Sequence, residues 1–188
     1  SSLSEKTKLV SLAGASNTVG AVIDVKEITR LAHEVGAVVS IDAAQLSPHV
    51  RVDVQDCDVD FISFSGHKMY APMGIGVMYG KYELLDKMVP YMYGGDMIEY
   101  VYEQNTTFAK PAAKFEAGTQ NVGGAIALAA AIDFMERVGV ENIHEHELAL
   151  TDYAYKKMSE LEFVEIYSTP SYNRSPLVSF NIKGVHSH

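Results

Sequence analysis

Five side chains that could take part in chemistry end or follow two short apolar stretches of the sequence. One stretch is AVVSID at residues 37–42, and the other is DFISFS at residues 60–65. The five side chains are Asp42, Gln45, Ser65, His67 and Lys68. Ligands of open α/β sheets bind outside the carboxyl ends of the strands, so we expect these side chains to share one edge of a sheet. Together they offer a carboxylate, an amide, a hydroxyl, an imidazole and an amine.

Lys68 is the most informative of these residues, because a lone lysine in a loop is usually solvated. Here it lies between the apolar segments FISFS and MYAPMGIG. An amine that forms a Schiff base must be partly shielded and held near an electrophile, and this position suits that role. Asp42 taken alone has a simpler interpretation, since an aspartate that ends a strand is more often a turn or cap residue.

The combination of these residues predicts a site for pyridoxal phosphate (PLP). This cofactor needs a lysine for a Schiff base, a carboxylate opposite its pyridinium nitrogen, and donors for its phosphate. Lys68 would supply the amine and Asp42 the carboxylate, while Ser65 and His67 would bind the phosphate.

The elements that must position these side chains are short apolar strands around one helix, the pattern of a mostly parallel α/β sheet. The helix is expected over residues 24–35, with Asp24 as its N-cap and Gly36 as its stop. The strands are expected at residues 9–14, 37–42, 60–65 and 74–80. The first strand is followed by Ser16 and Asn17, which would reach the same edge of the sheet.

The pattern changes after Pro90. Residues 91–120 have no sustained period, and a loop of this length inside a compact domain is usually functional. Helices are then expected at 121–138, closed by Gly139, and at 141–160, followed by strands at 163–167 and 177–182. We therefore expect residues 1–139 to form part of one large domain and residues 140–188 to begin a smaller C-terminal α/β domain.

Composition excludes several classes of function. The formal charge of −9 and the lack of a Lys and Arg cluster argue against nucleic-acid binding, and no apolar stretch is long enough to span a membrane. Cys57 is the single cysteine, so no disulfide can form within the chain, which favours the reducing cytoplasm. No metal site is expected, since His144 and His146 would point to different faces of a helix. The chain begins without Met, which suggests part of a longer protein.

The sequence resembles a known family through six blocks that occur in order. They are SNTVG (16–20), DAAQ (42–45), SGHK (65–68), GIGVMYGK (74–81), GGDMI (94–98) and FEAGTQN (115–121). This set is similar to the cofactor region of class-V PLP enzymes of fold type I. More narrowly, it resembles cysteine desulfurases of the sulfur-mobilising (SUF) type, which are close relatives of selenocysteine lyase. The resemblance implies a large domain with a mostly parallel sheet.

The resemblance also implies a role for each site residue. Lys68 would hold the cofactor as a Schiff base and later move the α-proton of the substrate. Asp42 would pair with the ring nitrogen, and Gln45 would donate a hydrogen bond to the phenolic oxygen of the ring. Ser65 and His67 would bind the phosphate.

Two further contacts implied by the resemblance reach outside this group. Gly118 and Thr119 lie in the segment that reaches the phosphate of the neighbouring subunit, so a homodimer is implied. Asn17 would help to hold the substrate carboxylate.

The function implied is that of a PLP-dependent cysteine desulfurase, which converts L-cysteine to L-alanine and passes a persulfide sulfur to an acceptor protein for iron–sulfur cluster assembly. Two alternatives stay open: a selenocysteine lyase or other class-V enzyme, and a catalytically silent module with the PLP-enzyme fold.

The family places the nucleophilic cysteine and the carboxylate-binding arginine beyond residue 188, so we expect the isolated chain to be inactive. Cys57 lies among acids that disfavour a thiolate, and we expect a structural role for it. Arg174 lies in a turn-like segment, and we expect it at the surface.

Overall fold

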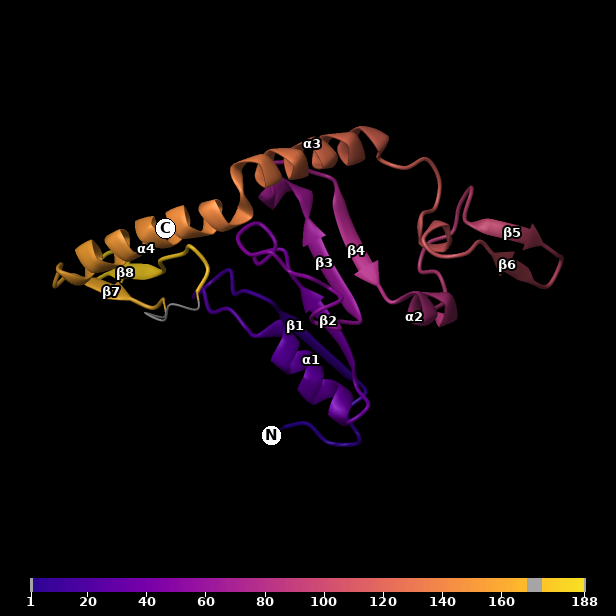
Figure 1. Ribbon diagram of the computed structural model, residues 1–188, viewed down its shortest axis with the longest axis horizontal. Helices are drawn as coiled ribbons and strands as arrows, with labels where there is room; N and C mark the ends of the chain where they lie inside the picture. Colours follow the sequence, from indigo (N-terminus) through magenta and orange to yellow (C-terminus); the bar gives the residue numbers. More distant parts are fainter. Residues whose placement is uncertain (1, 169–173, 188) are drawn as a thin grey trace.

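A four-stranded sheet forms the centre of the molecule (Figure 1). The computed structural model describes residues 2–168 and 174–187. The strand order is β1-β2-β3-β4, with the bounds Leu9–Ala13, Val38–Asp42, Phe61–Ser65 and Gly76–Gly80. β1, β2 and β3 are parallel, which confirms the predicted mostly parallel sheet. β4 is antiparallel to β3, because the connection between them is shorter than the roughly twelve residues that a parallel crossover needs.

Helix α1, Val25–Glu34, covers one face of this sheet. It begins as predicted, because the Asp24 side chain accepts a hydrogen bond from the Glu27 amide at 3.0 Å. Its buried residues, Val25, Thr29 and Ala32, face a core that includes the fully buried Val39 and Ile41 of β2. Burial of this apolar surface fixes the helix on the sheet.

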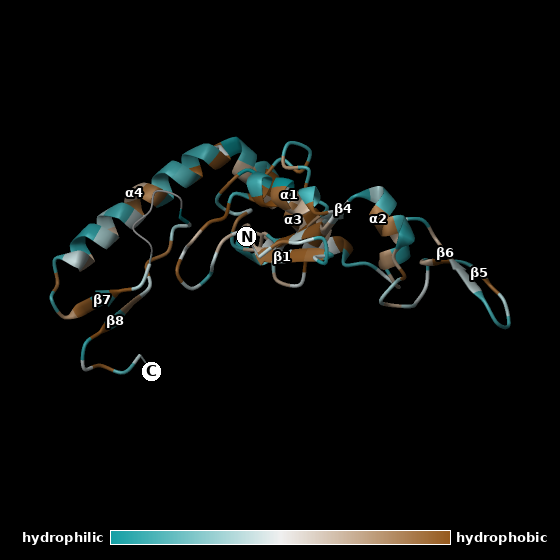
Figure 2. Cartoon of the chain, turned by 90° about the horizontal axis from the view of Figure 1, so that it is seen from below, coloured by the Kyte–Doolittle hydropathy of each residue, from teal (hydrophilic) through white to brown (hydrophobic). Residues whose placement is uncertain are grey.

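The other face of the sheet carries exposed side chains. Leu9 of β1 is 59% exposed and Met78 of β4 is 50% exposed, although both are large and apolar. Figure 2 shows hydrophobic residues gathered at the central sheet, with α4 and the β5–β6 hairpin extending away from it on opposite sides. Within this chain, the sheet is therefore covered mainly on the face that packs against α1.

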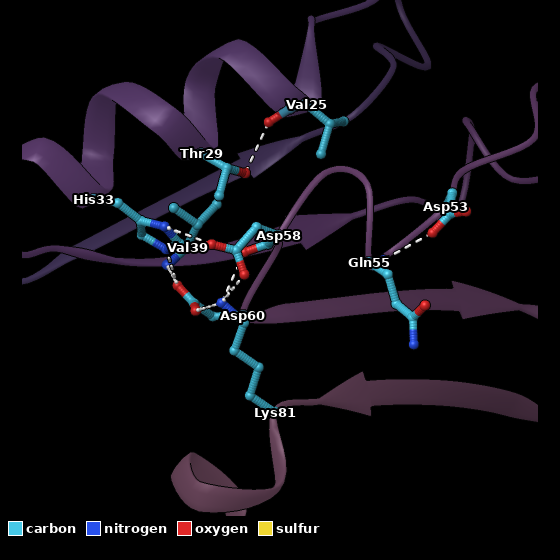
Figure 3. A network of polar contacts seen from close by, with 9 residues as sticks. All are labelled: Val25, Thr29, His33, Val39, Asp53, Gln55, Asp58, Asp60 and Lys81. Atoms are coloured by element: carbon cyan, nitrogen blue, oxygen red, sulfur yellow. Dashed lines mark hydrogen bonds and ion pairs between the residues drawn. The ribbon is translucent and has the colours of Figure 1, made fainter.

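A buried carboxylate joins four elements at the N-terminal edge of the parallel strands (Figure 3). Asp60, only 5% exposed, lies just before β3. It accepts a hydrogen bond from the Val39 amide at 2.7 Å and contacts His33 Nε2 on α1 and Lys81 Nζ after β4, both at 2.8 Å. The exposed Asp58 lies 2.6 Å from the same Lys81 ammonium.

The Asp60 contacts decide its ionisation. Burial alone would raise the pKa of this carboxyl, but the hydrogen bonds from Lys81, His33 and the Val39 amide together lower the pKa below its usual value. Burial likewise opposes the charge of Lys81, yet Asp58 and Asp60 raise the pKa of its ammonium. The pair therefore stays charged.

The stretch from 81 to 120 contains more regular structure than its sequence indicates. A short helix α2 spans Tyr82–Lys87, and the strands β5, Ile98–Val101, and β6, Thr106–Phe108, form an antiparallel hairpin. The prediction of an irregular loop at 91–120 was therefore wrong in part. All four side chains of β5 are exposed, so the strand has no one-sided apolar pattern to detect.

Two consecutive helices carry the chain away from the sheet. α3 spans Val122–Val138 and α4 spans Val140–Ser159, each within a residue of the predicted bounds. Gly139 between them has a φ of 92°, a conformation that favours glycine. The strands β7, Val164–Ile166, and β8, Phe180–Ile182, pair antiparallel and are shorter than predicted. None of the described helices is long and apolar enough to cross a membrane.

The burial of Arg174 differs from the expectation from the sequence. It is only 4% exposed, so the prediction of a surface residue was wrong. Its guanidinium forms an ion pair with Asp152 of α4 and lies 5.4 Å from the ring centroid of Tyr155. The turn-like sequence around it carries no sign of these partners, which lie on a different element.

Replacing Asp60 with Asn should lower the free energy of unfolding of the protein by about 2–3 kcal/mol, because a charged acceptor for three donors is lost from a buried position. Urea unfolding measures this change. Asp58→Asn is the matched control, since Asp58 touches the same Lys81 but is exposed. Equal losses in the two variants would contradict a special role for Asp60.

The same substitution should flatten the dependence of stability on pH in acid. The folded-state pKa of Asp60 is lowered, so its contribution is complete above the unfolded value of about 4 and is lost as pH falls through the folded value. Wild-type stability should therefore fall more steeply than that of Asp60→Asn below about pH 4.

Candidate functional site

The predicted edge residues lie where parallel strands end together. The Gly14 amide donates to Asp42 O at 2.8 Å, and the Ala43 amide donates to Ser63 O at 2.8 Å. β1 and β2 therefore end at one level, and β3 continues two residues further at the same edge, to Ser65. We call this edge, formed by residues 14–17, 42–45 and 65–68, the rim.

Asp42 and Ser65 point to the same face of the sheet. Asp42 pairs with Ser63 in the register of β2 and β3, and Ser65 follows Ser63 by two residues. Because side chains alternate along a strand, all three lie on the face opposite α1. Asp42 is exposed there, and one of its oxygens accepts a hydrogen bond from the Ala44 amide at 2.9 Å. Gln45 follows, half-buried, in the same turn.

Lys68 ends a single 3₁₀ turn, Gly66–Lys68, that is held on both sides. Before it, the Gly66 amide donates to Ile75 O at 2.9 Å, and a Cβ on Gly66 would lie 2.7 Å from Ile75 Cγ2. After it, the buried Met69 packs with Met135 and its neighbours on α3 and α4. Lys68 is half-buried, in agreement with the partial shielding that its sequence context predicts, and His67 is exposed.

The turn after β1 presents Asn17 at the rim. The Ser16 hydroxyl accepts hydrogen bonds from the amides of Thr18 and Val19, both at 3.2 Å. This closes a tight turn and leaves Asn17 exposed, with its amide oxygen accepting from the Thr18 hydroxyl at 3.2 Å. Ser16 therefore shapes the turn, and Asn17 is the side chain available to a ligand.

Gly118 and Thr119 lie on a separate segment. The Gly118 amide donates to Gly95 O at 2.9 Å, and Gly118 has a φ of 78°. The link from this segment to the rim comes two residues later, at Asn121. Its side-chain nitrogen donates to Gly74 O at 2.9 Å, and Gly74 lies just before Ile75, the partner of Gly66.

Asn121 was not predicted as a site residue. Its oxygen also accepts from the Gly124 amide at 2.9 Å, so one side chain caps α3 and holds the loop that supports the Lys68 turn. The sequence signal was an Asn directly before a helix, which indicates a cap but says nothing of Gly74.

Cys57 lies outside the rim, near the end of the connection from β2 to β3 and at the opposite end of β3 from Ser65. Burial raises the pKa of its thiol, and Asp56 raises it further. Both effects oppose the thiolate that a nucleophile needs, in agreement with the expected structural role. Among the described residues, no group of three or more His, Cys, Asp and Glu side chains could hold a metal ion.

The donor set of the rim fits one kind of ligand. A half-buried amine, a carboxylate and a hydroxyl on one face, and an exposed imidazole lie along adjacent strand ends. This set can bind an aldehyde, a ring nitrogen and a phosphate, the three groups that PLP carries.

A model of the class-V aminotransferase family matches residues 1–188. The chain belongs to this family. A cysteine desulfurase of Haloferax volcanii is 46% identical over 186 residues, which are 99% of this chain and 44% of that protein. This class-V chain therefore spans less than half the length of that relative.

Solved structures agree with the family. A cysteine desulfurase, CsdA of Escherichia coli, matches with a TM-score of 0.92 and 35% identity, over 98% of this chain and 45% of that one. A C-DES mutant with glycine covalently linked to its PLP cofactor matches with a TM-score of 0.83 and 25% identity, over 96% of this chain and 49% of that one. These matches confirm the predicted fold class and the resemblance to cysteine desulfurases.

Replacing Asn121 tests whether its side chain supports the turn that carries Lys68. Asn121→Asp keeps the acceptor that caps α3 but removes the donor to Gly74. The variant should keep α3 capped and lose no more than about 1.4 kcal/mol of stability, the scale of one lost hydrogen bond. The Gly66 amide should exchange its hydrogen about tenfold faster, because a change of that size shifts the local opening equilibrium by that factor. Hydrogen-exchange mass spectrometry or NMR measures this rate.

Asn105→Asp is the matched control for this measurement, since Asn105 is exposed at the tip of the β5–β6 hairpin. Unchanged exchange at Gly66 in Asn121→Asp would show that Asn121 does not support the Lys68 turn.

Proposed function

We propose that the full-length protein is a PLP-dependent cysteine desulfurase that converts L-cysteine to L-alanine and passes the sulfur to an acceptor protein. The observation that carries this proposal is the rim, where Lys68 lies on a clamped turn three residues after Ser65, at the edge of the sheet where β2 ends in Asp42. The similarity to cysteine desulfurases supports the choice of reaction.

Each rim residue has a distinct task in this proposal. Lys68 attaches the cofactor covalently and then moves the proton at the substrate α-carbon. Asp42 would pair with the ring nitrogen, and Gln45 would hydrogen-bond the phenolic oxygen. Ser65 and His67 donate hydrogen bonds to the phosphate. When bound, PLP supplies an electron-withdrawing ring that makes the α-proton of an amino acid removable.

The remaining steps involve Asn17 and a cysteine elsewhere in the full-length protein. Asn17, exposed at the rim, hydrogen-bonds the substrate carboxylate. A cysteine elsewhere in the full-length protein attacks the substrate sulfur as a thiolate. The carbon–sulfur bond then breaks and the sulfur remains on that cysteine as a persulfide. The carbon fragment takes up a proton at the β-carbon, and Lys68 returns one to the α-carbon, which gives alanine. Cys57 is unsuited to this step because its thiol pKa is raised.

We also infer a homodimer in which Gly118 and Thr119 reach the phosphate bound in the neighbouring subunit. Exposed apolar residues just before Gly94, which lies against Ala117 and Gly118, support this inference: Val89 is 79% exposed, Tyr91 75% and Tyr93 68%. Apolar patches of this kind mark interaction surfaces.

We propose that residues 1–139 belong to the large cofactor domain and that residues 140–188 begin the small domain. The SUF type, a role in iron–sulfur cluster assembly and a cytoplasmic location follow from the sequence resemblance and the single cysteine. A selenocysteine lyase is the second candidate, because substrate choice depends on contacts that the rim does not make.

Lys68→Ala in the full-length protein should abolish both the visible absorbance band of lysine-bound PLP and its covalent trapping by borohydride. Desulfurase activity should fall at least about a thousandfold, the scale of losing an essential catalytic group. Lys6→Ala, at an exposed lysine, should change neither. Undiminished trapping in Lys68→Ala would sink the assignment of the cofactor-binding lysine.

The isolated 188-residue chain should release no sulfide from L-cysteine in the presence of PLP and a thiol reductant, because it lacks the sulfur-accepting cysteine. Sulfide assayed with methylene blue measures this, with the full-length protein as the positive control. Release above that of a Lys68→Ala chain would overturn the expectation and show that residues 1–188 suffice.

A further inference from the structure

Lys114 is a buried lysine whose ammonium is held by backbone groups. The residue is 7% exposed and lies in a 3₁₀ turn, η2, Ala113–Phe115. Its Nζ donates to three backbone carbonyls, those of Leu85 at 3.3 Å, Asp86 at 2.7 Å and Met88 at 3.2 Å. The Phe115 ring lies beside it, with its centroid 5.7 Å from Nζ.

These three carbonyls lie at the end of α2. The last carbonyls of a helix lack the usual partner within it, so they can accept from an external donor, and the Leu85 carbonyl also accepts from the Met88 amide at 3.2 Å. Desolvating an ammonium is costly, and it is tolerated here because every proton of Nζ has a carbonyl within reach. Lys114 is thus a buried cross-link between α2 and the segment 113–119.

The same segment is fixed at its other end by Gly94 and Gly95. The Gly118 amide donates to Gly95 O at 2.9 Å, and a Cβ on Gly94 would lie 3.2 Å from Ala117 Cβ and 3.3 Å from Gly118 N. The base of the β5–β6 hairpin is closed nearby, where the Ala109 amide donates to the backbone oxygen of the fully buried Met97 at 2.9 Å. Residues 113–118 are therefore held between two fixed points.

We propose that Lys114 is a positioning residue for cofactor binding. It holds the segment 113–119 against α2, so that Gly118 and Thr119 are in place for the phosphate bound in the neighbouring subunit. Lys114 itself touches neither the phosphate nor the substrate. The inference rests on the proposed function, because it assigns to Lys114 the placement of two residues proposed there to bind the cofactor.

The test replaces Lys114 with Met in the full-length protein, which keeps the length of the side chain and removes all three donors. The apparent dissociation constant for PLP, from absorbance titration of the apoprotein, should rise at least about tenfold, the effect of losing one good phosphate contact. At saturating PLP, kcat should return to within about twofold of wild type, since the rim is unchanged.

Two readouts separate positioning from general structural damage. Lys114→Arg keeps a cation with several donors and should restore most of the PLP affinity. Hydrogen exchange in the apoprotein should increase in Lys114→Met at residues 113–119 and stay unchanged in β2 and β3. Lys110→Met is the matched control, because Lys110 lies four residues before Lys114 and its side chain, 77% exposed, reaches the Asp86 carboxylate at 3.4 Å and not the carbonyls of α2.

Gly94→Ala tests the same segment from its other end and covers the case in which Lys114→Met does not fold. The added Cβ would press on Ala117, so PLP affinity should fall in this variant too. Wild-type PLP affinity in Lys114→Met, or in Gly94→Ala when Lys114→Met is unfolded, would overturn the proposal for Lys114. Failure of the wild-type protein to bind PLP would instead overturn the proposed function.

Discussion

The parallel register of β1, β2 and β3 is the constraint on which the rest of the structure depends. Val39 and Ile41 of β2 are fully buried against α1, and the alternate residues Ser40 and Asp42 point to the opposite face. Since side chains alternate, a slip of one residue would expose this core and turn Asp42 towards α1. Burial of a few aliphatic side chains thus decides which face of the sheet carries the carboxylate of the rim.

The two edges of the sheet have different roles: one stabilises the fold, and the other carries the side chains proposed to meet a ligand. At the N-terminal edge, Asp60 is buried and its oxygens are engaged by His33, Val39 and Lys81, so its charge stabilises the junction of α1 with the strands. At the rim, Asp42 is exposed and Lys68 is only half-buried. A polar group that holds the fold is enclosed by partners, whereas a group that meets a ligand must keep an open approach.

The rim is supported by contacts between segments far apart in the chain. Asn121 joins the start of α3 to Gly74, and Lys114 joins η2 to the end of α2. In both cases a side chain donates to a backbone carbonyl, so the supporting contact depends on one residue type at one position. Each contact fixes a helix end against a neighbouring segment. The Asn121 contact joins the segment that follows Gly118 to the loop that supports the Lys68 turn.

The sequence by itself determined the local structure. The cap at Asp24, the strands of the sheet and the break at Gly139 all rest on signals within a few neighbouring residues, and the structure agrees with them. The roles of the rim residues rest on the same kind of local signal and stay predictions. Only the tertiary structure decided the burial of Arg174, the exposed hairpin and the carbonyls around Lys114. These features depend on partners about twenty or more residues away or on the absence of one-sided burial. Local periodicity carries no information about either, because a side chain's environment is set by whatever the fold brings beside it.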